Sequence, residues 1–466
     1  MSLSVDVAVI GSGPGGYRAA VMARQQGLTV AIIEGGSWGG TCLNRGCVPK
    51  KAWYDVARLI ALQSGFATRG IAGTLSADAN AAWAHQRRVS AQVRAGYVDY
   101  LDRLGIVRVE SFARFTGGRQ LSVGTQSLSA GAVIVATGSR PLLPPALRIQ
   151  DARILSTDNL FEQPLPAGRR IAVLGSGAVG TEMTFILHHL GFSVSWLMGQ
   201  PPMSRSAFSA PAQRLLLERL KACGVVPRTG ARVSYAAASG DDGLLLALDD
   251  GSRLTVDWVL AGTGRIPNTE RLNAGAAGMT LAEGGQIVTD AHCGAADGIY
   301  AIGDVSNPAM TANHALADAA VAVRNILKPG SATRDDVWVP EALYSAIELA
   351  RAGLGEDAAE AEGLEPATGF AAFESNPQAL ADGEPDGFLR VLADLDSGRP
   401  LGVEMAGPGV AELVGLLGPV FGGPDGLSRL AAAAYNHPSR GEECLNAVEA
   451  MAARWGLNIP PPDRLG

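Results

Sequence analysis

A strand, glycine turn and helix occur in succession twice in this chain, and no other sequence feature constrains its fold as strongly. In the first copy, the apolar segment Val5 to Ile10 runs into Gly11-Ser-Gly13-Pro-Gly15-Gly16, and a helical pattern follows over Tyr17 to Gln26. Such a turn lets the backbone approach a pyrophosphate at the N-terminus of a helix. Glu34 ends the next predicted strand, Leu28 to Ile33, where an acid can accept hydrogen bonds from an adenosine ribose. The first unit is therefore predicted to bind a dinucleotide.

The second copy begins with the predicted strand Ile171 to Leu174 and continues through Gly175-Ser-Gly177-Ala-Val-Gly180 into a helix that ends near Leu190. Its next strand, Ser193 to Met198, ends without the acid that a ribose would need. Arg205, seven residues later, could instead approach a 2′-phosphate. NAD is the favoured nucleotide and NADP the alternative. Two such units predict two dinucleotides, or one flavin and one nicotinamide.

Length and charge exclude several classes of protein. A chain of 466 residues should hold two to four domains. Its 38 basic and 45 acidic residues give a net charge of −7 with no basic block, so nucleic acid is not an expected partner. No apolar run approaches the roughly 18 to 20 residues of a membrane helix. The N-terminus shows no basic region followed by a cleavage site, and five scattered cysteines do not suit a disulfide scaffold, so the cytoplasm is the expected compartment.

The most informative motif is Gly39-Gly40-Thr41-Cys42-Leu-Asn-Arg-Gly46-Cys47-Val-Pro-Lys-Lys51. On a regular helix, residues five apart are separated by about 7.5 Å of axial rise, which is beyond comfortable disulfide reach. If Cys42 and Cys47 pair, Cys42 must lie in a turn or a distorted first turn, with Gly46 supplying the freedom. A thiol at a helix N-terminus near Lys51 would have a lowered pKa. The alternative is two buried, reduced cysteines.

A zinc site is not expected here, because no second close cysteine pair supplies the other ligands. The remaining cysteines, Cys223, Cys293 and Cys444, have no patterned partners and are predicted to be structural. The histidines form no ligand constellation either. No metal site is therefore predicted.

Near the C-terminus, His437-Pro438-Ser439-Arg440-Gly441-Glu442 places an imidazole and a carboxylate five residues apart. A base and its orienting acid in this arrangement can deprotonate a thiol near neutral pH. Taken alone, His437 would more often be a surface loop residue, but the cysteine pair favours the functional interpretation. Arg440 and Glu443 are predicted to be solvated surface charges.

Two further acids follow glycine-containing segments. Glu182 comes directly after the second glycine turn, and by position alone it is an ordinary acid in the first turn of a helix. Asp304 follows Ala301-Ile-Gly303 and is a candidate helix cap.

Together these motifs make the chain resemble the flavoprotein disulfide reductases, and among them the dihydrolipoamide dehydrogenases most closely. The resemblance runs colinearly through essentially the whole chain. It includes the two glycine turns with Glu34 and Glu182, the cysteine motif with Lys51, residues 136–141 and 262–268, Ala301 to Asp304, and His437-Pro438 with Glu442.

The resemblance implies an α/β chain with two Rossmann-like dinucleotide-binding domains, for FAD and NAD(P), and an α+β C-terminal dimerisation domain. The expected boundaries are 1–145 for the first part of the FAD-binding domain, 146–270 for the NAD(P)-binding domain, 271–335 for the central part of the FAD domain, and 336–466 for the interface domain. A homodimer is implied as well.

The resemblance also implies roles for individual residues. Cys42 would exchange with the substrate and Cys47 would face the flavin. Lys51 and Glu182 would pair beside the flavin, and His437, oriented by Glu442, would act as acid and base on the disulfide of the partner subunit. The expected cofactor contacts are Gly11, Gly13, Gly15, Gly16, Glu34, Gly40, Thr41, Lys51, Thr137, Gly138, Asp304, Gly175, Gly177, Gly180, Glu182 and Gly264.

The implied activity passes electrons between a lipoyl dithiol or disulfide, on a carrier protein or as a small molecule, and NAD through Cys42, Cys47 and FAD. Some residues depart from the pattern: Lys50 resembles glutathione reductase, whereas Leu43 and Ala178 resemble dihydrolipoamide dehydrogenase. An NADPH-dependent reductase of glutathione or another low-molecular-weight disulfide therefore stays the alternative. A flavin-binding interaction protein is a third interpretation, which the intact cysteine pair disfavours. Arg45 and Arg440 are further expected to flank the disulfide and steer an anionic carrier.

Overall fold

The computed structural model describes residues 2–240, 243–421, 423 and 425–460. The chain divides into two compact units. The first contains Met1–Trp53, Asp78–Leu174 and Val233–Val337, and the second contains Tyr54–Ala77, Gly175–Arg232 and Trp338–Gly466. The four-domain division expected from the sequence remains a prediction, and Met1 and residues 461–466, which it includes, lie outside the described residues.

The first unit is built on a mixed sheet whose strands run in the order β17-β18-β6-β1-β2-β3, with the hairpin β4-β5 attached to β6. The pairs β1–β2, β1–β6, β2–β3 and β6–β18 are parallel. The strands are β1 (Ser2–Ile10), β2 (Val30–Glu34), β3 (Val107–Glu110), β4 (Ala113–Gly117), β5 (Gln120–Val123), β6 (Gln126–Val135), β17 (Gly294–Ala296) and β18 (Ile299–Ala301).

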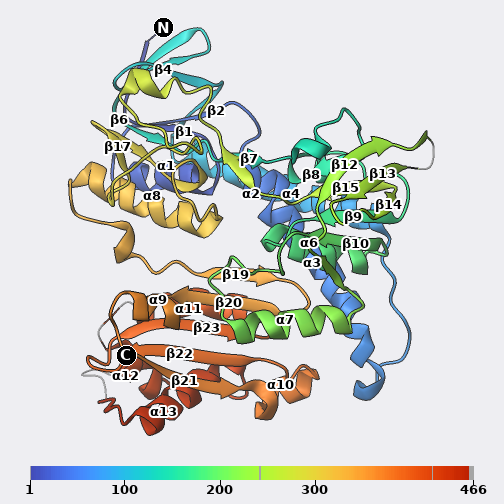
Figure 1. Ribbon diagram of the computed structural model, residues 1–466. Coiled ribbons are helices and arrows are strands. Elements are labelled where there is room, and N and C mark those ends of the chain that lie inside the picture. The colour runs from blue at the N-terminus through green and yellow to red at the C-terminus, as the bar shows by residue number, and fades with distance from the viewer. Residues whose placement is uncertain (1, 241–242, 422, 424, 461–466) are drawn as a thin grey trace. The chain divides into compact units, whose positions relative to one another are not determined.

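Both faces of this sheet are buried, as expected for parallel strands that are nearly continuous apolar runs. Helices α1 (Pro14–Gln25) and α8 (Ala312–Leu327) lie side by side against one face, as Figure 1 shows. Their core includes Val7, Val9, Ala19, Ile32 and Ala319. The helix α4 (Ala79–Arg103) also adds Leu101 to this core, and the Asp78 side chain caps its N-terminus.

The first unit also contains three parallel strands, β8 (Ile154–Ser156), β9 (Arg170–Leu174) and β15 (Trp258–Ala261), with β15 between the other two. An antiparallel sheet is formed by β12 (Val233–Ala238), β13 (Leu244–Leu248) and β14 (Arg253–Val256). Two short strands, β7 (Ser139–Pro141) and β16 (Arg265–Pro267), pair antiparallel. The helix α5 (Thr157–Leu160) follows β8.

In the second unit, α6 (Ala178–His189) leads into β10 (Ser193–Met198), which pairs in parallel with β11 (Pro227–Thr229). The helix α7 (Ala210–Ala222) connects these two strands. The C-terminal part is an antiparallel sheet in the order β19-β20-β23-β22-β21. Its strands are β19 (Glu341–Tyr344), β20 (Glu348–Gly353), β21 (Pro366–Ala372), β22 (Phe388–Asp394) and β23 (Pro400–Ala406).

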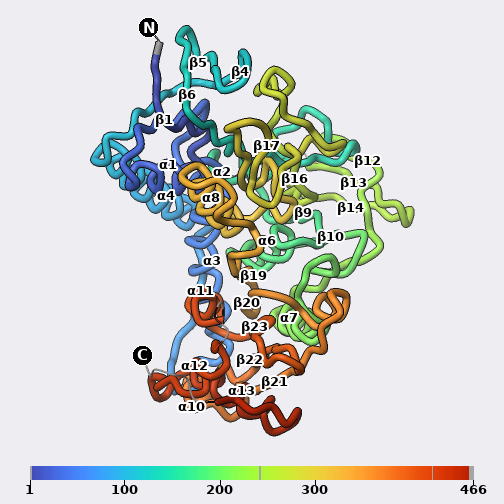
Figure 2. Tube along the Cα trace, turned by 90° about the vertical axis from the view of Figure 1, so that its left-hand side faces the viewer, coloured from blue at the N-terminus to red at the C-terminus, as the bar shows by residue number. Residues whose placement is uncertain are grey.

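Helices α11 (Val410–Phe421), α12 (Gly426–Ala432) and α13 (Glu443–Trp455) pack on one face of the C-terminal sheet, where Figure 2 shows them close to its strands. Val391, Met405, Val414 and Met451 belong to the shared core. Two short helices, α9 (Glu356–Ala361) and α10 (Pro377–Asp382), flank β21 in sequence.

The predicted mixed α/β class is confirmed, and the predicted elements lie within a few residues of their expected positions. The strand predicted at Ser193 to Met198 coincides with β10, and the helix predicted over Tyr17 to Gln26 is α1, which begins earlier, at Pro14. Within the described part of the chain, no helix combines the length and the apolar character needed to cross a bilayer.

Candidate active site

The first glycine turn joins β1 to α1 and has two kinds of glycine. At Gly11, where φ is 103°, an added Cβ would lie 2.3 Å from a backbone oxygen, and at Gly16 it would lie 1.9 Å from the oxygen of Gly11. Gly15 packs closely against α8. At Gly13, by contrast, an added Cβ would meet no atom within 4 Å. Gly11 and Gly16 are therefore required by the turn itself. Gly13 instead leaves the backbone accessible, as a pyrophosphate-binding turn, here called a cradle, requires.

Glu34 is held against this turn at the end of β2. Its Oε2 accepts hydrogen bonds from the backbone N–H of Ser12 at 2.9 Å and from the Ser12 hydroxyl at 2.6 Å, and its Oε1 accepts from the N–H of Gly36 at 2.8 Å. The carboxylate therefore lies where the sequence predicted, beside the glycine turn. Its contact with a ribose stays a prediction.

Three more predicted cofactor residues lie around the ends of β6, β7 and β16. The Thr137 hydroxyl donates to the carbonyl of Asn268 at 2.7 Å, and the N–H of Asn268 donates to the carbonyl of Gly138 at 2.9 Å. Gly264 lies directly before β16 with φ at 122°, a conformation that favours glycine. These contacts hold residues 137–138 and 264–268 next to one another.

Asp304 lies in a short 3₁₀ turn, Gly303–Val305, directly after β18. Its Oδ2 accepts a hydrogen bond from the Ser139 hydroxyl at 2.5 Å, and the guanidinium of Arg265 lies 3.8 Å away. The carboxylate is thus joined to the same group of segments as Thr137 and Gly264. It does not cap the following helix, because the side chain of Thr311 caps α8.

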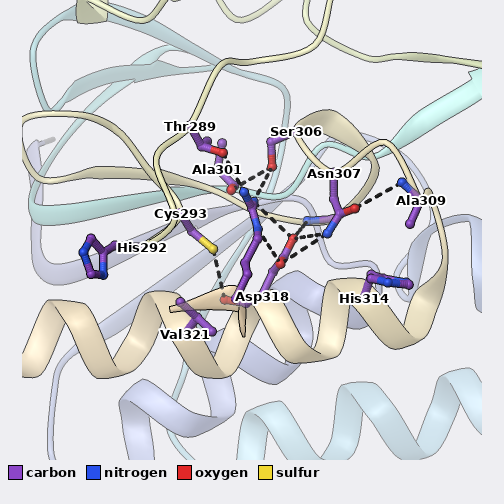
Figure 3. Close-up of polar contacts among 12 residues, drawn as sticks. Thr289, His292, Cys293, Ala301, Ser306, Asn307, Ala309, His314, Asp318 and Val321 are labelled. Atoms are coloured by element: carbon purple, nitrogen blue, oxygen red, sulfur yellow. Dashed lines mark hydrogen bonds and ion pairs between the residues drawn. The ribbon is translucent and has the colours of Figure 1, made fainter. Parts of the chain in front are cut away.

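A buried polar network lies beneath the Asp304 turn (Figure 3). Asp318 of α8 is 2% exposed and accepts hydrogen bonds from the N–H of Gly303 at 3.0 Å and from Nε of Arg334 at 2.9 Å. Arg334 also donates to Thr289 at 2.8 Å, and Asn307 donates to Asp318 at 3.3 Å. The network fixes the turn that carries Asp304, although no sequence motif pointed to Asp318 or Arg334.

The cysteine motif folds into two helices that meet at Gly46. α2 (Gly40–Arg45) ends at this glycine, whose φ and ψ of −140° and −115° are not helical, and α3 (Cys47–Leu62) follows. An added Cβ on Gly46 would come within 3.3 Å of Cys42 Cα, so the chain turns tightly here. The break brings the side chain of Cys42 within hydrogen-bonding distance of Cys47. The five-residue spacing of the cysteines requires such a break, and it lies at Gly46.

Each thiol affects the ionisation of the other. The hydrogen bond to Cys47, together with burial, raises the pKa of the Cys42 thiol well above its ordinary value, and the charge of Lys50 opposes the shift. Two thiolates so close together repel each other, which disfavours ionisation of both. Cys42 is half-buried and Cys47 is exposed at the start of α3. The lowered pKa expected for a thiol near Lys51 is therefore wrong for Cys42, because burial and the neighbouring thiol outweigh the charge of Lys50.

α2 is anchored on both sides of Cys42. An added Cβ on Gly40 would lie 2.8 Å from Gly13 Cα, so this end of α2 packs against the first glycine turn, and Thr41 follows it directly. Arg45 lies 3.8 Å from the carboxylate of Asp158 and 3.7 Å from that of Glu162. Neighbouring carboxylates therefore offset part of the charge of Arg45, and the expectation that it steers an anionic partner stays a prediction.

Tyr97 is a residue near the cysteines that the sequence analysis did not single out. Its ring stacks on that of Tyr17, with centroids 4.0 Å apart. Burial and the charges of Cys42 and Cys47 raise the pKa of the Tyr97 phenol. No local pattern reveals this contact, because α1 and α4 are distant in sequence.

The second glycine turn repeats the design of the first. An added Cβ on Gly180 would lie 2.1 Å from the oxygen of Gly175, whereas one on Gly177 would meet nothing within 4 Å. Nε1 of Trp196 donates to the carbonyl of Gly175 at 2.9 Å and ties the turn to β10. At the end of β10, Met198 is buried. This second cradle therefore also presents bare backbone, at Gly177.

Glu182 lies in the first turns of α6 and is 7% exposed, which is unusual for an ordinary helix acid. Its Oε1 accepts a hydrogen bond from the N–H of Tyr344 at 2.9 Å. Lys51 lies one turn after Cys47 in α3. Lys51 belongs to the first unit and Glu182 to the second, and their pairing stays a prediction.

His437 and Glu442 are brought together in the second unit. Nδ1 of His437 lies 2.7 Å from Oε1 of Glu442, and the N–H of Ser439 donates to Oε2 at 2.8 Å. These two hydrogen bonds lower the pKa of the Glu442 carboxyl, with that from Ser439 contributing most. The His437 side chain is 73% exposed, so it can reach a group outside its own chain.

The loop that carries His437 is fixed by two buried charges, which corrects the expectation of solvated surface residues. Arg440 is 9% exposed and donates to Asp382 at 2.9 Å. Glu443 is buried as well, and its carboxylate accepts from the side chain of Asn376 at 2.8 Å. The same Asn376 amide donates to the carbonyl of Ser439 at 2.9 Å. Arg440 consequently has no role as a steering charge at the surface.

The other three cysteines are buried to different extents. Burial and the charge of Asp318 raise the pKa of the Cys293 thiol to about 12, and burial also raises that of Cys444 to about 12. Cys223 is half-buried, and burial raises the pKa of its thiol too. All three thiols therefore stay protonated near neutral pH, which suits a structural role.

Comparisons with known proteins agree with this arrangement. Residues 5–320 match the family described as pyridine nucleotide-disulphide oxidoreductase, and residues 339–448 match its dimerisation domain. Dihydrolipoyl dehydrogenase 3 of Pseudomonas aeruginosa is 34% identical, with 97% of this chain and 99% of that protein covered. Dihydrolipoyl dehydrogenase of Thermus scotoductus is 33% identical, with 96% and 97% covered.

Two solved structures share the fold. LpdA from Mycobacterium tuberculosis superposes with a TM-score of 0.87 at 23% identity, covering 96% of this chain and 99% of that one. The HOCl-induced flavoprotein disulfide reductase RclA from Escherichia coli superposes with a TM-score of 0.81 at 23% identity, covering 95% and 99%.

The dihydrolipoyl dehydrogenase family uses FAD and NAD, and the two glycine turns fit these cofactors. Gly13 and Gly177 each leave open the space next to the backbone that a pyrophosphate occupies at a helix N-terminus. Full-length similarity, the paired thiols and these two cradles lead to one assignment. The chain belongs to the pyridine nucleotide-disulphide oxidoreductase family and is an FAD-dependent oxidoreductase acting on sulfur groups.

Proposed function

We propose that this chain oxidises dihydrolipoamide with NAD through the thiols of Cys42 and Cys47. The observation that carries the proposal is the break at Gly46, which brings these two thiols into hydrogen-bonding contact at the start of α3. The substrate assignment is supported by relatives named dihydrolipoyl dehydrogenase that match over nearly the whole chain.

The thiol chemistry takes two exchange steps. In the oxidised enzyme, a thiolate of the substrate attacks Sγ of Cys42, and Cys47 leaves as a thiolate. The second substrate thiol then attacks the substrate sulfur of this mixed disulfide, and Cys42 leaves. The substrate has lost two electrons and two protons and become a cyclic disulfide, while the protein has gained the two electrons as a pair of thiols. NAD is the final oxidant.

His437 and Glu442 would handle the protons. The imidazole takes the proton of the attacking substrate thiol, and Glu442 stabilises the imidazolium through the 2.7 Å contact with Nδ1. In a homodimer His437 would serve the cysteine pair of the partner subunit. The proposal includes this homodimer, the four domains at 1–145, 146–270, 271–335 and 336–466, a lipoyl carrier protein as partner, and the cytoplasm as compartment.

The nucleotide cofactors would be held by the two cradles. The first glycine turn with Glu34, Thr137, Gly138 and Asp304 would bind FAD, and the second turn, Gly175 to Gly180, would bind NAD. FAD, when bound, supplies the two-electron exchange between the thiols and the nicotinamide. Lys51 and Glu182 would pair beside it, and the protein would exclude water from the thiols.

A second candidate is an NADPH-dependent reductase of a low-molecular-weight disulfide such as glutathione disulfide. Met198, at the end of β10, has no hydrogen-bonding acceptor for a ribose hydroxyl. In the cysteine motif, the charge of Lys50 opposes the rise in the pKa of the Cys42 thiol. The fold shared with the flavoprotein disulfide reductase RclA is compatible with this alternative too.

Steady-state turnover of the FAD-loaded protein separates the two candidates. Dihydrolipoamide with NAD or NADP is compared with glutathione disulfide and NADPH or NADH, using Cys42→Ser as the control for dependence on the thiol. We expect NAD reduction by dihydrolipoamide to be the fastest reaction and to be lost in Cys42→Ser. Reduction of glutathione disulfide by NADPH without lipoamide activity would transfer the function to the second candidate.

A further inference from the structure

The second unit contains a cavity of about 120 Å³, and none of the residues assigned to the thiol chemistry lines it. Its walls come from the second half of α3, the loop after α3, α6, α7, the start of β20 and residues 382–386. A cavity of roughly 150 Å³ can hold a molecule the size of benzene. This cavity therefore has room for a small hydrocarbon group.

Most of the charged side chains around this cavity already have close partners. A charged group that is satisfied within the protein offers little to a ligand. The satisfied contacts are Tyr54 with Glu348 at 3.2 Å, Arg440 with Asp382 at 2.9 Å, Arg219 with Asp386 at 2.5 Å, and Arg69 with the carbonyl of Asp382 at 2.7 Å.

Arg58 and Glu384 are the exceptions. Nη2 of Arg58 lies 3.9 Å from Oε2 of Glu384, which is too far for a hydrogen bond. Among the residues that the structure describes, no other side chain or backbone group hydrogen-bonds to the guanidinium of Arg58 or to the carboxylate of Glu384. The Glu384 side chain is 22% exposed, and burial raises the pKa of its carboxyl. A cation and an anion thus line the same cavity with unused hydrogen-bonding capacity.

The segment that carries Glu384 is held in place before any ligand binds. Nη2 of Arg440 donates to the carbonyl of Glu384 at 3.3 Å, and Nη1 donates to the carboxylate of Asp382. Nη1 of Arg69 donates to the carbonyl of Asp382 from the other side. Because the backbone is fixed, a ligand that pairs with Glu384 does not have to order this segment.

Apolar side chains complete the lining. The rings of Tyr54 and Phe185 are both buried, with centroids 6.1 Å apart, and Ile347 and Pro408 also line the cavity. Such walls favour a hydrocarbon group through burial. The Arg58 side chain is 39% exposed, so the charged edge of the cavity is accessible from solvent.

We propose that this cavity binds a small zwitterion with an apolar side chain, of the chemical class of the aliphatic α-amino acids. The ligand carboxylate pairs with Arg58, its ammonium group pairs with Glu384, and its side chain packs against Tyr54 and Phe185. Both charged groups of an α-amino acid are attached to one carbon, which suits two protein groups that are 3.9 Å apart. A ligand with a single charge satisfies one of the two groups and leaves the other without a partner.

Calorimetric titration of the FAD-loaded protein tests the proposal with three probes. These are L-leucine, L-leucinamide, which lacks the carboxylate, and isocaproate, which lacks the amino group. We expect leucine to bind at least roughly tenfold more tightly than either analogue, because each analogue loses one charge-assisted hydrogen bond. Equal affinities for the three probes, or no binding of leucine at millimolar concentration, would overturn the proposal.

Two substitutions assign the two ends of the ligand. Glu384→Gln should abolish the preference for leucine over isocaproate and keep the preference over leucinamide, and Arg58→Gln should do the reverse. Glu374→Gln, which removes an exposed acid outside the cavity, should change neither preference. If one cavity variant does not fold, the other is sufficient, because each is expected to lose one preference only. Preferences that persist in the folded variants would refute the assignment.

Thermal unfolding supplies a second readout. A ligand that binds only the native protein raises its Tm. Leucine should raise the Tm of the wild-type protein and of Cys42→Ser equally, and it should have no effect on the variant with both Arg58→Gln and Glu384→Gln. A rise that is retained in this double variant would place leucine elsewhere and overturn the proposal. The inference does not rest on the proposed function, since no step of the test needs turnover of a dithiol.

Discussion

Replacement of Asp318 by asparagine perturbs the buried network under the Asp304 turn. Asn keeps the shape of the side chain but removes the charge that faces Arg334 at 2.9 Å. Breaking a buried ion pair by removing one partner costs about 3–5 kcal/mol. The Arg334 side chain is 26% exposed, so water can solvate part of its charge in the variant. We therefore expect the free energy of unfolding to fall by about 3 kcal/mol, the lower end of this range.

For a unit of this size, about 3 kcal/mol corresponds to a fall in Tm of roughly 6 °C. Thermal unfolding followed by flavin fluorescence measures this shift, because fluorescence rises when FAD is released. Arg103→Leu is the matched control: it breaks the exposed pair of Arg103 with Asp99 and should cost less than about 0.5 kcal/mol. A Tm for Asp318→Asn within about 1 °C of that of the control would refute the account of this network.

Three further predictions concern the glycine turn and the His437 loop. Gly16→Ala should prevent folding of the FAD-binding part, since its Cβ would lie 1.9 Å from a backbone oxygen, as circular dichroism would show. Gly13→Ala should fold but bind FAD at least roughly tenfold more weakly in a titration. Normal FAD affinity in Gly13→Ala would contradict a pyrophosphate site at Gly13. Asp382→Asn should lower the free energy of unfolding by about 3 kcal/mol, because the buried Arg440 loses its carboxylate partner. Arg440→Leu should lower it by about 1 kcal/mol or less, because water can solvate the Asp382 carboxylate. A lower Tm for Arg440→Leu than for Asp382→Asn would contradict this order. Glu442→Gln should lower kcat roughly a hundredfold at neutral pH, where the wild-type carboxylate is ionised. The ratio of wild-type to variant kcat should shrink as the pH falls below the ordinary carboxyl range and through the lowered pKa of Glu442. A ratio that grows in acid would contradict the role of the Glu442 charge.

Local patterns predicted most of the elements that build the site. The strand at Ser193 to Met198 and the helix after the first glycine turn, α1, are encoded by their apolar patterns. The break at Gly46 was also predictable, since two cysteines five residues apart cannot meet on a regular helix. Glu442 was found next to His437, as their spacing suggested.

Long-range partners account for what the sequence did not predict. Arg440 and Glu443 are buried because Asp382 and Asn376, 58 and 67 residues away, satisfy their polar groups. A charged residue without a visible partner is ordinarily assigned to the surface, and that rule fails here. The stack between Tyr17 and Tyr97 has the same origin, because it depends on how α1, α2 and α4 pack rather than on any local motif.

The central claim, that electrons from the dithiol substrate enter through Cys42 and Cys47, can be tested by a single turnover. The oxidised, FAD-loaded protein is mixed anaerobically with dihydrolipoamide in the absence of NAD and quenched with iodoacetamide, and the alkylated cysteines are identified by mass spectrometry. The account predicts that the substrate renders Cys42 and Cys47 newly alkylated and leaves Cys223, Cys293 and Cys444 unchanged. Dihydrolipoamide oxidation with no new alkylation at Cys42 and Cys47 would contradict it.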